Sequence, residues 1–322
     1  MCAVALPLSP PLAPQLARSA KDLPSGDGWR YEPKWDGFRT IAFRDGDEVH
    51  LQSRGGKPMN RYFPEVVEQV RAMPADGVVL DGEIVVEVDG VQQFDLLSQR
   101  IHPAESRVLM LAERTPARYI AFDALAVGGA SLLERGYDAR RAALDALDLG
   151  PVEVSPSLSD AAGARVWLTG HWEGVVAKEG EAPYLPGERR GMVKVKRRRT
   201  ADMVVVAFRW GKAEGTVGSL ILGLHDESGE LRVVGHTSGF SAAQKRELTG
   251  LLEPYRTHES GSGGPTRWKP AEELEWEGLR PELVCEISYD HVSGGRIRHG
   301  TTFLRWRDDK APAECTMDQL SA

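Results

Sequence analysis

Short stretches with the composition of β-strands recur along the whole chain, and they constrain the fold more than any other feature of the sequence. Up to about residue 207 they alternate with a few segments of helical spacing. Beyond residue 201 strands dominate, and one predicted helix, Ala242–Leu252, interrupts them. Because several strand-like runs are separated by short turns, we expect antiparallel sheets and an α+β fold.

The first part of the chain is expected to contain both kinds of element. Helical spacing occurs at residues 63–73, 104–113, 138–147 and 160–168, and strand-like runs lie at residues 29–32, 39–44, 49–53, 78–80, 83–88, 119–126, 174–177 and 192–195. The letters D-G-D-E at residues 45–48 predict a hairpin turn between two of these strands. In the helix at residues 138–147, Arg140 and Arg141 are expected on the polar side.

The second part is predicted to be a small barrel. Its strand-like runs lie at residues 203–208, 219–224, 231–236, 283–289 and 301–306. About five strands with one helix are the inventory of the OB-fold. The letters E-S-G-S-G-G at residues 259–264 indicate a flexible loop. A length of 322 residues fits two domains of about 150 residues each, and we place their boundary near residues 199–202.

Cysteine usage and hydropathy exclude several classes of protein. Cys2, Cys285 and Cys315 are widely spaced and form no C-x-x-C pair, which excludes a disulfide framework and disfavours a structural zinc site. No apolar run reaches the roughly 18 residues that a membrane-spanning helix needs. The start of the chain, residues 1–14, has no basic segment and is broken by prolines, so we expect a cytosolic protein.

The charge of the chain is concentrated locally. A net charge of −7 argues against a nucleic-acid partner, because Lys and Arg must neutralise phosphates. However, residues 189–199 contain seven basic residues and no acidic one. This basic run is equally compatible with a solvated face or a charged linker.

One short element carries chemical information. Residues 34–39 read K-W-D-G-F-R, directly after a strand-like run. By itself this pattern fits a turn at Asp36 and Gly37 with solvated basic neighbours just as well. Other common signatures, such as G-x-x-x-x-G-K-[ST], G-x-S-x-G, H-E-x-x-H and G-x-G-x-x-G, are absent.

The K-W-D-G-F-R element resembles motif I of the covalent nucleotidyltransferases, the superfamily of polynucleotide ligases and mRNA capping enzymes, whose lysine is the nucleophile. The other family motifs follow in order: S-R-G at 53–55, L-D-G-E at 80–83, Y-I-A-F-D at 119–123, E-G-V-V-A-K at 173–178, M-V-K-V-K at 192–196 and R-W-R-D-D-K at 305–310. This resemblance covers nearly the whole chain. It implies an ATP-grasp-like nucleotidyltransferase (adenylation) domain at residues 1–200 and an OB-fold domain at residues 201–322.

The resemblance makes Lys34 the nucleophile. A lysine with the ordinary pKa of about 10.4 is almost wholly protonated at neutral pH, so an attacking lysine needs neighbouring cations that favour the neutral amine. Lys194 and Lys196 alternate with valines and should share one face of a strand, which suits a phosphate cleft. The resemblance implies that Lys194 and Lys196 are both catalytic residues and ATP-binding residues. It also implies that Arg307 and Lys310 are catalytic and orient the departing pyrophosphate.

Two glutamates are expected to serve the metal and the ribose. Glu83 and Glu173 are each adjacent to a glycine and are expected at strand ends. A lone glutamate in such a place is usually solvated or ion-paired. By resemblance, Glu173 binds the metal and Glu83 binds the ribose or the metal. Hard carboxylates suit Mg²⁺, with Mn²⁺ as an alternative.

The resemblance also assigns the remaining nucleotide and DNA contacts. Phe122, in an apolar strand, becomes a stacking face for adenine, although an aromatic there is more often core. Expected ATP contacts further include Glu32 or its backbone at the base edge, Arg39 at the ribose, Arg54 at the phosphate of AMP or of the nick, and Lys178. Expected DNA contacts are Arg54 and, at the hinge, Arg197, Arg198 and Arg199.

Within the superfamily, the motifs at residues 173–178 and 305–310 look like those of ATP-dependent DNA ligases. The finer likeness is to the small bacterial LigC-type enzymes and to the ligase module of ligase D. This implies ATP, nicked duplex DNA, a role in DNA repair with DNA-end-binding repair proteins, and a monomer in the bacterial cytosol, associated with the nucleoid. Three alternatives stay open: a capping-type guanylyltransferase, an RNA ligase, and a non-catalytic scaffold that binds DNA ends.

Overall fold

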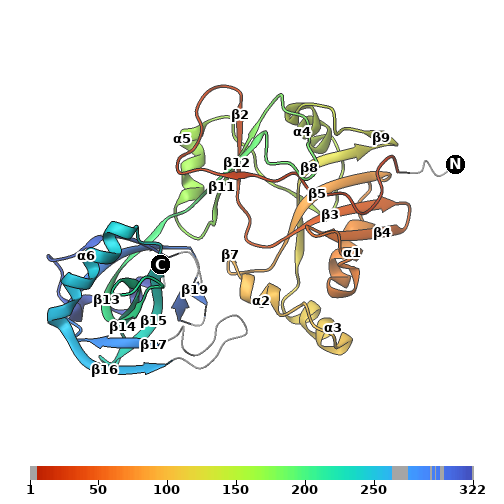
Figure 1. Ribbon diagram of the computed structural model, residues 1–322. Helices are drawn as coiled ribbons and strands as arrows, with labels where there is room; N and C mark the ends of the chain where they lie inside the picture. Colours follow the sequence, from red (N-terminus) through yellow and green to blue (C-terminus); the bar gives the residue numbers. More distant parts are fainter. Residues whose placement is uncertain (1–5, 263–274, 291, 294, 298–300, 321–322) are drawn as a thin grey trace. The chain divides into compact units, whose positions relative to one another are not determined.

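The chain folds into two compact units. The computed structural model describes residues 6–262, 275–290, 292, 293, 295–297 and 301–320. The units comprise Met1–Arg197 and Arg198–Ala322, and each has its own hydrophobic core (Figure 1). The division falls inside the basic run at residues 189–199.

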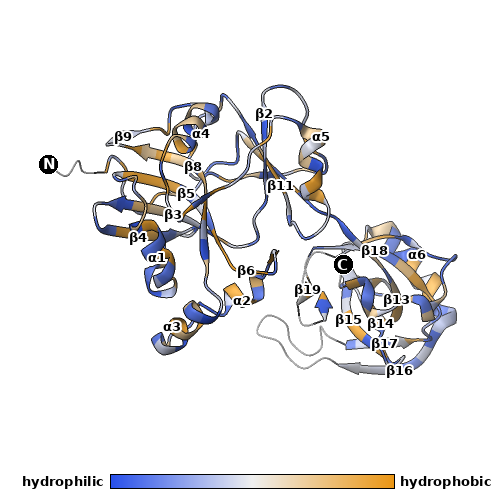
Figure 2. Cartoon of the chain, turned by 180° about the vertical axis from the view of Figure 1, so that it is seen from behind, coloured by the Kyte–Doolittle hydropathy of each residue, from blue (hydrophilic) through white to orange (hydrophobic). Residues whose placement is uncertain are grey.

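The larger sheet of the first unit is antiparallel at its centre. In order, it contains β10 (Glu153–Val154), β8 (Arg118–Val127), β5 (Val78–Val85), β3 (Phe38–Asp45) and β4 (Glu48–Ser53), with β9 (Ala130–Ser131) beside β8. The central strands β5 and β8 carry mostly hydrophobic residues (Figure 2). Helix α1 (Pro64–Arg71) packs its buried valines against this sheet. The predicted hairpin of β3 and β4 is confirmed.

A second sheet brings distant motifs side by side. Its order is β1 (Arg18–Ser19), β12 (Met192–Lys196), β11 (Gly174–Glu179) and β2 (Trp29–Pro33). Strand β11 is antiparallel to both β12 and β2, whereas β1 runs parallel to β12. The segment that precedes Lys34 therefore lies in one sheet with the strands that carry the E-G-V-V-A-K and M-V-K-V-K motifs.

Helices and short turns complete the first unit. They are α2 (Phe94–Ser98), α3 (Glu105–Arg114), α4 (Tyr137–Asp145), α5 (Ala161–Ala164), the 3₁₀ turns η1 (Asn60–Tyr62) and η2 (Arg165–Leu168), and the small ribbon of β6 (Glu87–Val88) and β7 (Val91–Gln92). Helix α5 begins at Asp160, whose side chain accepts hydrogen bonds from two backbone N–H groups of its first turn. No helix in the described part of the chain has the length and apolar character of a membrane span.

The prediction that Arg140 lies on the polar side of its helix is wrong. Arg140 is 1% exposed, and its guanidinium donates to Asp123 on β8 at 2.8 and 3.0 Å. It also donates to the carbonyls of Arg135 and Ala182. A buried charge requires such a partner, and the partner lies on another element, so the spacing of apolar residues along the helix could not show it.

The second unit is one strongly curved sheet. Its elements are β13 (Arg199–Trp210), β14 (Val217–His225), β15 (Leu231–Ser238), α6 (Ala242–Leu252), β16 (Arg256–Ser262), β17 (Glu275–Leu279), β18 (Val284–Tyr289) and β21 (Thr302–Trp306), with the ribbon β19 (Val292–Ser293) and β20 (Arg296–Ile297) and the turns η3 (Glu253–Tyr255), η5 (Pro312–Glu314) and η6 (Met317–Leu320). Strand β13 pairs with β14 from Val204 to Trp210, and with β18 and β17 on its other edge. Register shifts in β13 bend the strand, which lets the sheet curl around its core.

Two further predictions are corrected. Part of the loop expected at residues 259–264 is strand β16, which ends at Ser262, and residues 263 and 264 lie outside the described residues. Strand β17 has the sequence E-W-E-G-L, and because of its charged residues the sequence did not predict it as a strand.

In the first unit, β5 continues through Asp81 and Gly82, so Glu83 lies inside a strand rather than at its end. The predicted helix α6 is confirmed at both ends, and a capping box of Ser241 and Gln244 explains its start.

Candidate active site

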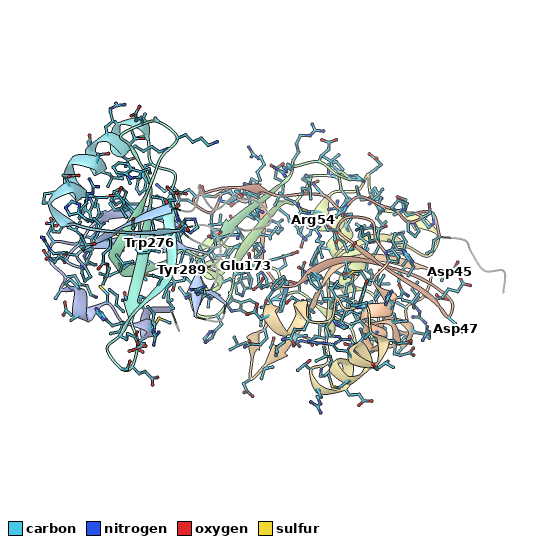
Figure 3. All side chains as sticks on the ribbon, turned by 60° about the horizontal axis from the view of Figure 1, so that its bottom comes forward. Asp45, Asp47, Arg54, Glu173, Trp276 and Tyr289 are labelled. Carbon is cyan, nitrogen blue, oxygen red and sulfur yellow. The ribbon has the colours of Figure 1, made fainter. Side chains whose placement is uncertain are left out.

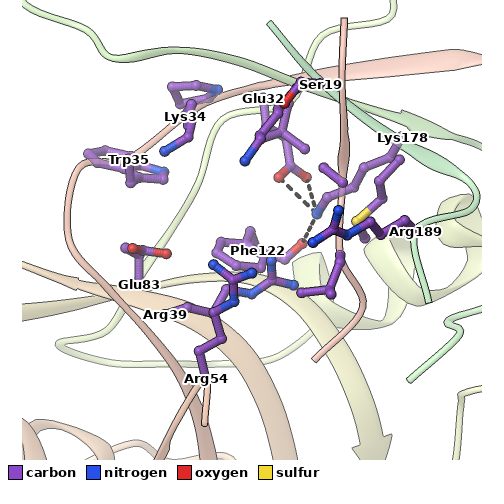
Figure 4. A pocket seen from close by; sticks show the side chains of 16 residues that line it. Ser19, Glu32, Lys34, Trp35, Arg39, Arg54, Glu83, Phe122, Lys178 and Arg189 are labelled. Atoms are coloured by element: carbon purple, nitrogen blue, oxygen red, sulfur yellow. Dashed lines mark hydrogen bonds and ion pairs between the residues drawn. The ribbon is translucent and has the colours of Figure 1, made fainter. Parts of the chain in front are cut away.

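A cavity of about 230 Å³ in the first unit receives side chains from both sheets. Eight predicted site residues line it: Glu32, Lys34, Arg39, Arg54, Glu83, Phe122, Lys178 and Lys194. The structure therefore brings together residues that are up to 162 positions apart, Glu32 and Lys194 being the extremes. Figure 4 shows Lys34 and Glu83 on the left of the pocket, Phe122 in the middle, Arg39 and Arg54 below it, and Arg189 on the right.

Lys34 is fixed directly after β2. Its backbone N–H donates to the carbonyl of Gly174 at 2.8 Å, and its ammonium forms an ion pair with Glu173. A side chain at Gly174 would collide with the carbonyl oxygen of Val195, 2.2 Å from the Cβ position, and the residue has φ +151°. Glycine at this position therefore allows β11 and β12 to approach closely and places Glu173 beside Lys34.

The residue after Lys34 is held from two sides. The Trp35 indole donates to the hydroxyl of Ser155 at 2.9 Å, and its ring meets that of Trp172 edge-to-face with centroids 5.2 Å apart. Trp35 is 9% exposed. These contacts restrict the backbone from which the Lys34 side chain projects.

The two lysines of β12 are placed differently. Lys194 lines the cavity, whereas Lys196 is 40% exposed at its side chain and lies 3.5 Å from Glu173, outside the cavity lining. The neighbouring Val193 and Val195 are buried, as the alternation along the strand predicts. Burial, followed by the charges of Lys34 and Lys196, lowers the pKa of Lys194.

Glu83 faces the cavity from the middle of β5. Burial raises its pKa to about 8, with Glu173 adding to the effect and Lys34 and Arg39 opposing it. A bound cation would stabilise the charged carboxylate. Gly37 allows this geometry, because a Cβ there would lie 2.2 Å from the carbonyl oxygen of Ile84 and 2.9 Å from Cγ of Glu83.

Phe122 lies between two cations. The Arg39 guanidinium carbon is 5.0 Å and the Lys178 ammonium 4.6 Å from the centroid of its ring. Arg39 is held by Asp81, which accepts from its Nε and Nη2 at 2.9 and 2.6 Å and from the Tyr184 hydroxyl at 2.6 Å. The ring and the guanidinium are thus fixed before any ligand binds.

Glu32 and Lys178 form a buried ion pair in the cavity wall. The Lys178 ammonium donates to Glu32 at 2.8 Å and to the carbonyl of Phe122 at 3.2 Å, and both side chains are 3% exposed. The Tyr137 hydroxyl also donates to Glu32. This cluster places an immobilised carboxylate beside the aromatic ring of Phe122 (Figure 4).

Sequence reasoning missed part of the lining. Leu16, Ala17 and Ser19 reach the cavity because β1 pairs with β12, and Arg189 reaches it from the loop before β12. The other unpredicted lining residues are Pro33, Trp35, Val176 and Met192. Arg189 belongs to the basic run at residues 189–199, so its composition could have indicated a phosphate-binding role. No local sequence pattern, in contrast, predicts the two-residue strand β1.

Arg54 reaches the cavity from the position directly after β4, and the hairpin turn at Asp45 and Asp47 lies at the opposite end of that strand (Figure 3). The remaining predicted residues, which include Glu173 and Lys196, do not line this cavity. Arg197 ends the first unit and Arg198 begins the second. The other members of this set are Arg199, at the start of β13, and Arg307 and Lys310, which both contact Asp202 in the second unit.

The described residues contain no cluster of three or more His, Cys, Asp and Glu side chains that could bind a metal by themselves. Glu83 lines the cavity, and Glu173 does not line it but pairs with Lys34, which does. Mg²⁺ commonly uses one or two carboxylates together with substrate phosphates and water. The donor set therefore fits a magnesium ion that arrives with a nucleotide.

Comparison with known families gives two matches. Residues 10–196 match the model of the ATP dependent DNA ligase domain. Residues 213–310 match the model of the ATP dependent DNA ligase C terminal region. Together the two models cover most of both units.

Individual relatives agree with these matches. The chain is 47% identical to DNA ligase C1 of Mycolicibacterium smegmatis over 332 residues, covering 98% of this chain and 95% of that protein. It is 43% identical to DNA ligase C of Mycobacterium tuberculosis, with the same coverage. A solved structure of mycobacterial DNA ligase D complexed with ATP and MES aligns with a TM-score of 0.53 at 30% identity, covering 95% of this chain and 98% of that one. The predicted α+β class, with an adenylation domain followed by an OB-fold, is thereby confirmed.

Proposed function

The chain belongs to the ATP-dependent DNA ligase family, and we propose that it seals nicks bearing a 5′-phosphate and a 3′-hydroxyl in duplex DNA, with Lys34 as its nucleophile. Enzymes of this family use ATP and make phosphodiester bonds. The observation that carries the assignment of Lys34 is its position in a cavity that is also lined by Phe122, Lys194 and Glu83, with its ammonium paired to Glu173. We assign residues 1–200 to adenylation and residues 201–322 to the OB-fold domain.

The proposed reaction has three steps. Lys34 Nζ, after losing a proton, attacks the α-phosphorus of ATP; an N–P bond forms, and the bond to the β-phosphate breaks as pyrophosphate leaves. The 5′-phosphate at the nick then attacks the same phosphorus and releases Lys34. Finally the 3′-hydroxyl attacks the DNA phosphorus and displaces AMP, with loss of the hydroxyl proton.

Each wall of the cavity has a proposed part in binding ATP. Phe122 presents its ring to the base, and Glu32, held by Lys178, offers a carboxylate to an amino group at the base edge. Arg39 binds the ribose, and Arg54 and Lys194 bind phosphate. Lys196 adds positive charge beside Glu173.

Glu173 and Glu83 would hold Mg²⁺, which when bound supplies positive charge beside the reacting phosphate. The ammonium of Lys34 pairs with Glu173, so a metal bound at Glu173 would compete with Lys34 for the same carboxylate. Mn²⁺ has the same preference for oxygen ligands and is expected to substitute for Mg²⁺.

Incubation with α-³²P-ATP and Mg²⁺ tests the proposal. We expect a labelled protein adduct that survives denaturation, and sealing of a nicked duplex by the same preparation. Labelled GTP should give no adduct, because the guanine edge presents a carbonyl oxygen to the Glu32 carboxylate. An adduct with GTP alone would support a capping-type enzyme, no adduct would support a scaffold, and sealing of RNA but not DNA would support an RNA ligase.

We also propose where the second unit meets DNA. A cavity of about 500 Å³ at the end of β13 is lined by three cations, Arg209, Lys212 and Lys245, together with His236 and Trp210. Within the described residues no acidic group pairs with Arg209, and its Nε is buried without a hydrogen-bond acceptor. Glu275 is the acidic residue of this lining. Such a group of cations beside an exposed tryptophan suits the sugar-phosphate backbone.

Substitution of Lys245 by alanine should weaken binding of nicked DNA by inactive Lys34→Ala protein. We expect the slope of log K against log salt concentration to become shallower by about 0.9 for a lost phosphate contact. Arg280→Ala is the matched control, because Arg280 is already paired with Glu282 at 2.7 Å in the same unit. Fluorescence anisotropy between 50 and 200 mM salt measures both variants. Equal slopes for the variant and the control would show that Lys245 does not contact a DNA phosphate.

The proposed cellular setting rests on the named bacterial relatives. We place the enzyme in the bacterial cytosol, at the nucleoid, as a monomer that acts in DNA repair. DNA-end-binding repair proteins are its proposed partners. Co-sedimentation with nicked DNA and analytical ultracentrifugation test the DNA association and the monomeric state.

A further inference from the structure

We propose that Asp202 is the positioning residue for Arg307 and Lys310, and that it thereby controls the adenylation step alone. This inference rests on the proposed function, in which Arg307 and Lys310 meet the departing pyrophosphate. It is carried by contacts inside the second unit, where Asp202 belongs to β13 and the two cations follow β21.

One carboxylate contacts both cations. Arg307 Nη1 donates to Oδ1 of Asp202 at 2.7 Å, and Lys310 Nζ lies 3.2 Å from the other oxygen, Oδ2. The side chain of Asp202 is 11% exposed, compared with 18% for Arg307 and 25% for Lys310. Asp202 therefore bridges two side chains that are three positions apart, and it fixes the distance between their charges.

Asp202 is itself held rigidly. Its backbone N–H donates to the side-chain oxygen of Gln319 at 2.8 Å, and its carbonyl accepts from the amide nitrogen of Gln319 at 3.1 Å. The carbonyl of Gln319 accepts in turn from the Tyr289 hydroxyl at 3.0 Å. A side chain on such a support can orient its partners, because its own backbone has little freedom.

Arg307 has a second acidic neighbour, Asp309, which restrains it less than Asp202 does. Its Nε and Nη2 donate to Asp309 at 2.8 and 2.9 Å, but the Asp309 side chain is 64% exposed. An exposed pair is screened by solvent and contributes little order. Among the described residues, acceptors engage three of the five N–H groups of Arg307. The other two are left for a phosphate, and the carboxylate of Asp202 determines where they point.

The balance of charge around Arg307 and Lys310 explains why these two side chains suit pyrophosphate as a leaving group. Two cations and two carboxylates are neutral together, so Arg307 and Lys310 are stably held while no pyrophosphate is near. Pyrophosphate carries several negative charges and can attract both cations without their being rearranged. The later steps release no pyrophosphate, so they do not need this arrangement.

Single-turnover kinetics of Asp202→Ala test the proposal. We expect the rate of lysyl-AMP formation at saturating ATP to fall about 10- to 100-fold, as for other small misplacements of catalytic groups, while the apparent Kd for ATP changes less than about threefold. Sealing of a nick that already carries a 5′-adenylate should stay within about twofold of wild type. In an Arg307→Ala, Lys310→Ala background the Asp202 substitution should have almost no further effect.

Matched variants keep the outcome interpretable. Asp226→Ala removes another ion-paired aspartate of the same unit, bound to Arg232 at 2.9 Å, and should leave both steps unchanged. Asp202→Glu should restore part of the adenylation rate. If Asp202→Ala fails to fold, Asp202→Asn replaces it, because the amide keeps the shape and one acceptor.

Three results would overturn the proposal: unchanged adenylation in Asp202→Ala, an equal loss in adenylation and in sealing of the adenylated nick, or a full additional loss in the Arg307→Ala, Lys310→Ala background. Failure of the proposed function is distinguishable, because wild-type protein would then form no adduct with ATP at all.

Discussion

Replacing Lys34 with alanine should reduce ATP-dependent nick sealing by at least about a thousandfold, because the covalent intermediate can no longer form. Lys194 lines the same cavity and is a candidate substitute. However, it projects from β12, whereas Lys34 is fixed after β2 by the hydrogen bond of its backbone to Gly174. An amine on a different strand would attack from a different position, whereas the reaction requires alignment with the leaving pyrophosphate.

The same variant should still seal a nick that is supplied with its 5′-adenylate, because that step needs no lysine nucleophile. Lys57→Ala is the control: Lys57 is exposed and does not line the cavity, so its removal should leave both activities unchanged. Gel assays with labelled ATP and with adenylated DNA distinguish the steps. A labelled adduct in the Lys34→Ala protein would show that another residue is the nucleophile.

The chemistry of the cavity was predictable mainly through the order of its motifs. Lys34, Glu83 and Lys194 each have an ordinary structural interpretation when taken alone, and their collinear arrangement gave them meaning. What the sequence could not show is how each is restrained. Glu32 was expected at the base edge, but its binding to Lys178 and to Tyr137 depends on residues more than 100 positions away.

Strand β5 illustrates why local patterns fail at such a site. Asp and Gly disfavour strands, so the pair Asp81 and Gly82 indicated a break between two strands. The strand continues because Asp81 is buried against Arg39 and Tyr184. A long-range ion pair outweighs the local propensity there, and as a result Glu83 is held on a rigid strand rather than on a loop.

Buried ion pairs thus recur around the cavity, and Arg140 with Asp123 is the most deeply buried of those described here, at 1% and 0% side-chain exposure. The guanidinium also lies over the rings of Tyr137 and Tyr184, 5.8 and 5.5 Å from their centroids. Arg140 therefore joins α4 to β8 and contacts two tyrosines, of which Tyr137 donates to Glu32 in the cavity wall and Tyr184 donates to Asp81, the partner of Arg39.

Arg140→Ala should destabilise the first unit by about 3–5 kcal/mol, because the substitution leaves the Asp123 carboxylate buried without its partner. For a unit of this size we expect its melting temperature to fall by roughly 6–20 °C in calorimetry of the full chain. Arg71→Ala is the control: Arg71 and Glu68 form a surface pair on α1, whose loss should cost less than about 1 kcal/mol.

The pair can be examined further by removing its second member. In the Arg140→Ala background, Asp123→Ala deletes the uncompensated charge, so the double variant should be less destabilised than the sum of the single ones by about 1–3 kcal/mol. Additive effects, or a loss in Arg140→Ala no larger than in Arg71→Ala, would mean that water reaches the Asp123 carboxylate. The stability of the first unit would then come from its apolar core, and Arg140 would serve only to seat Tyr137 against Glu32.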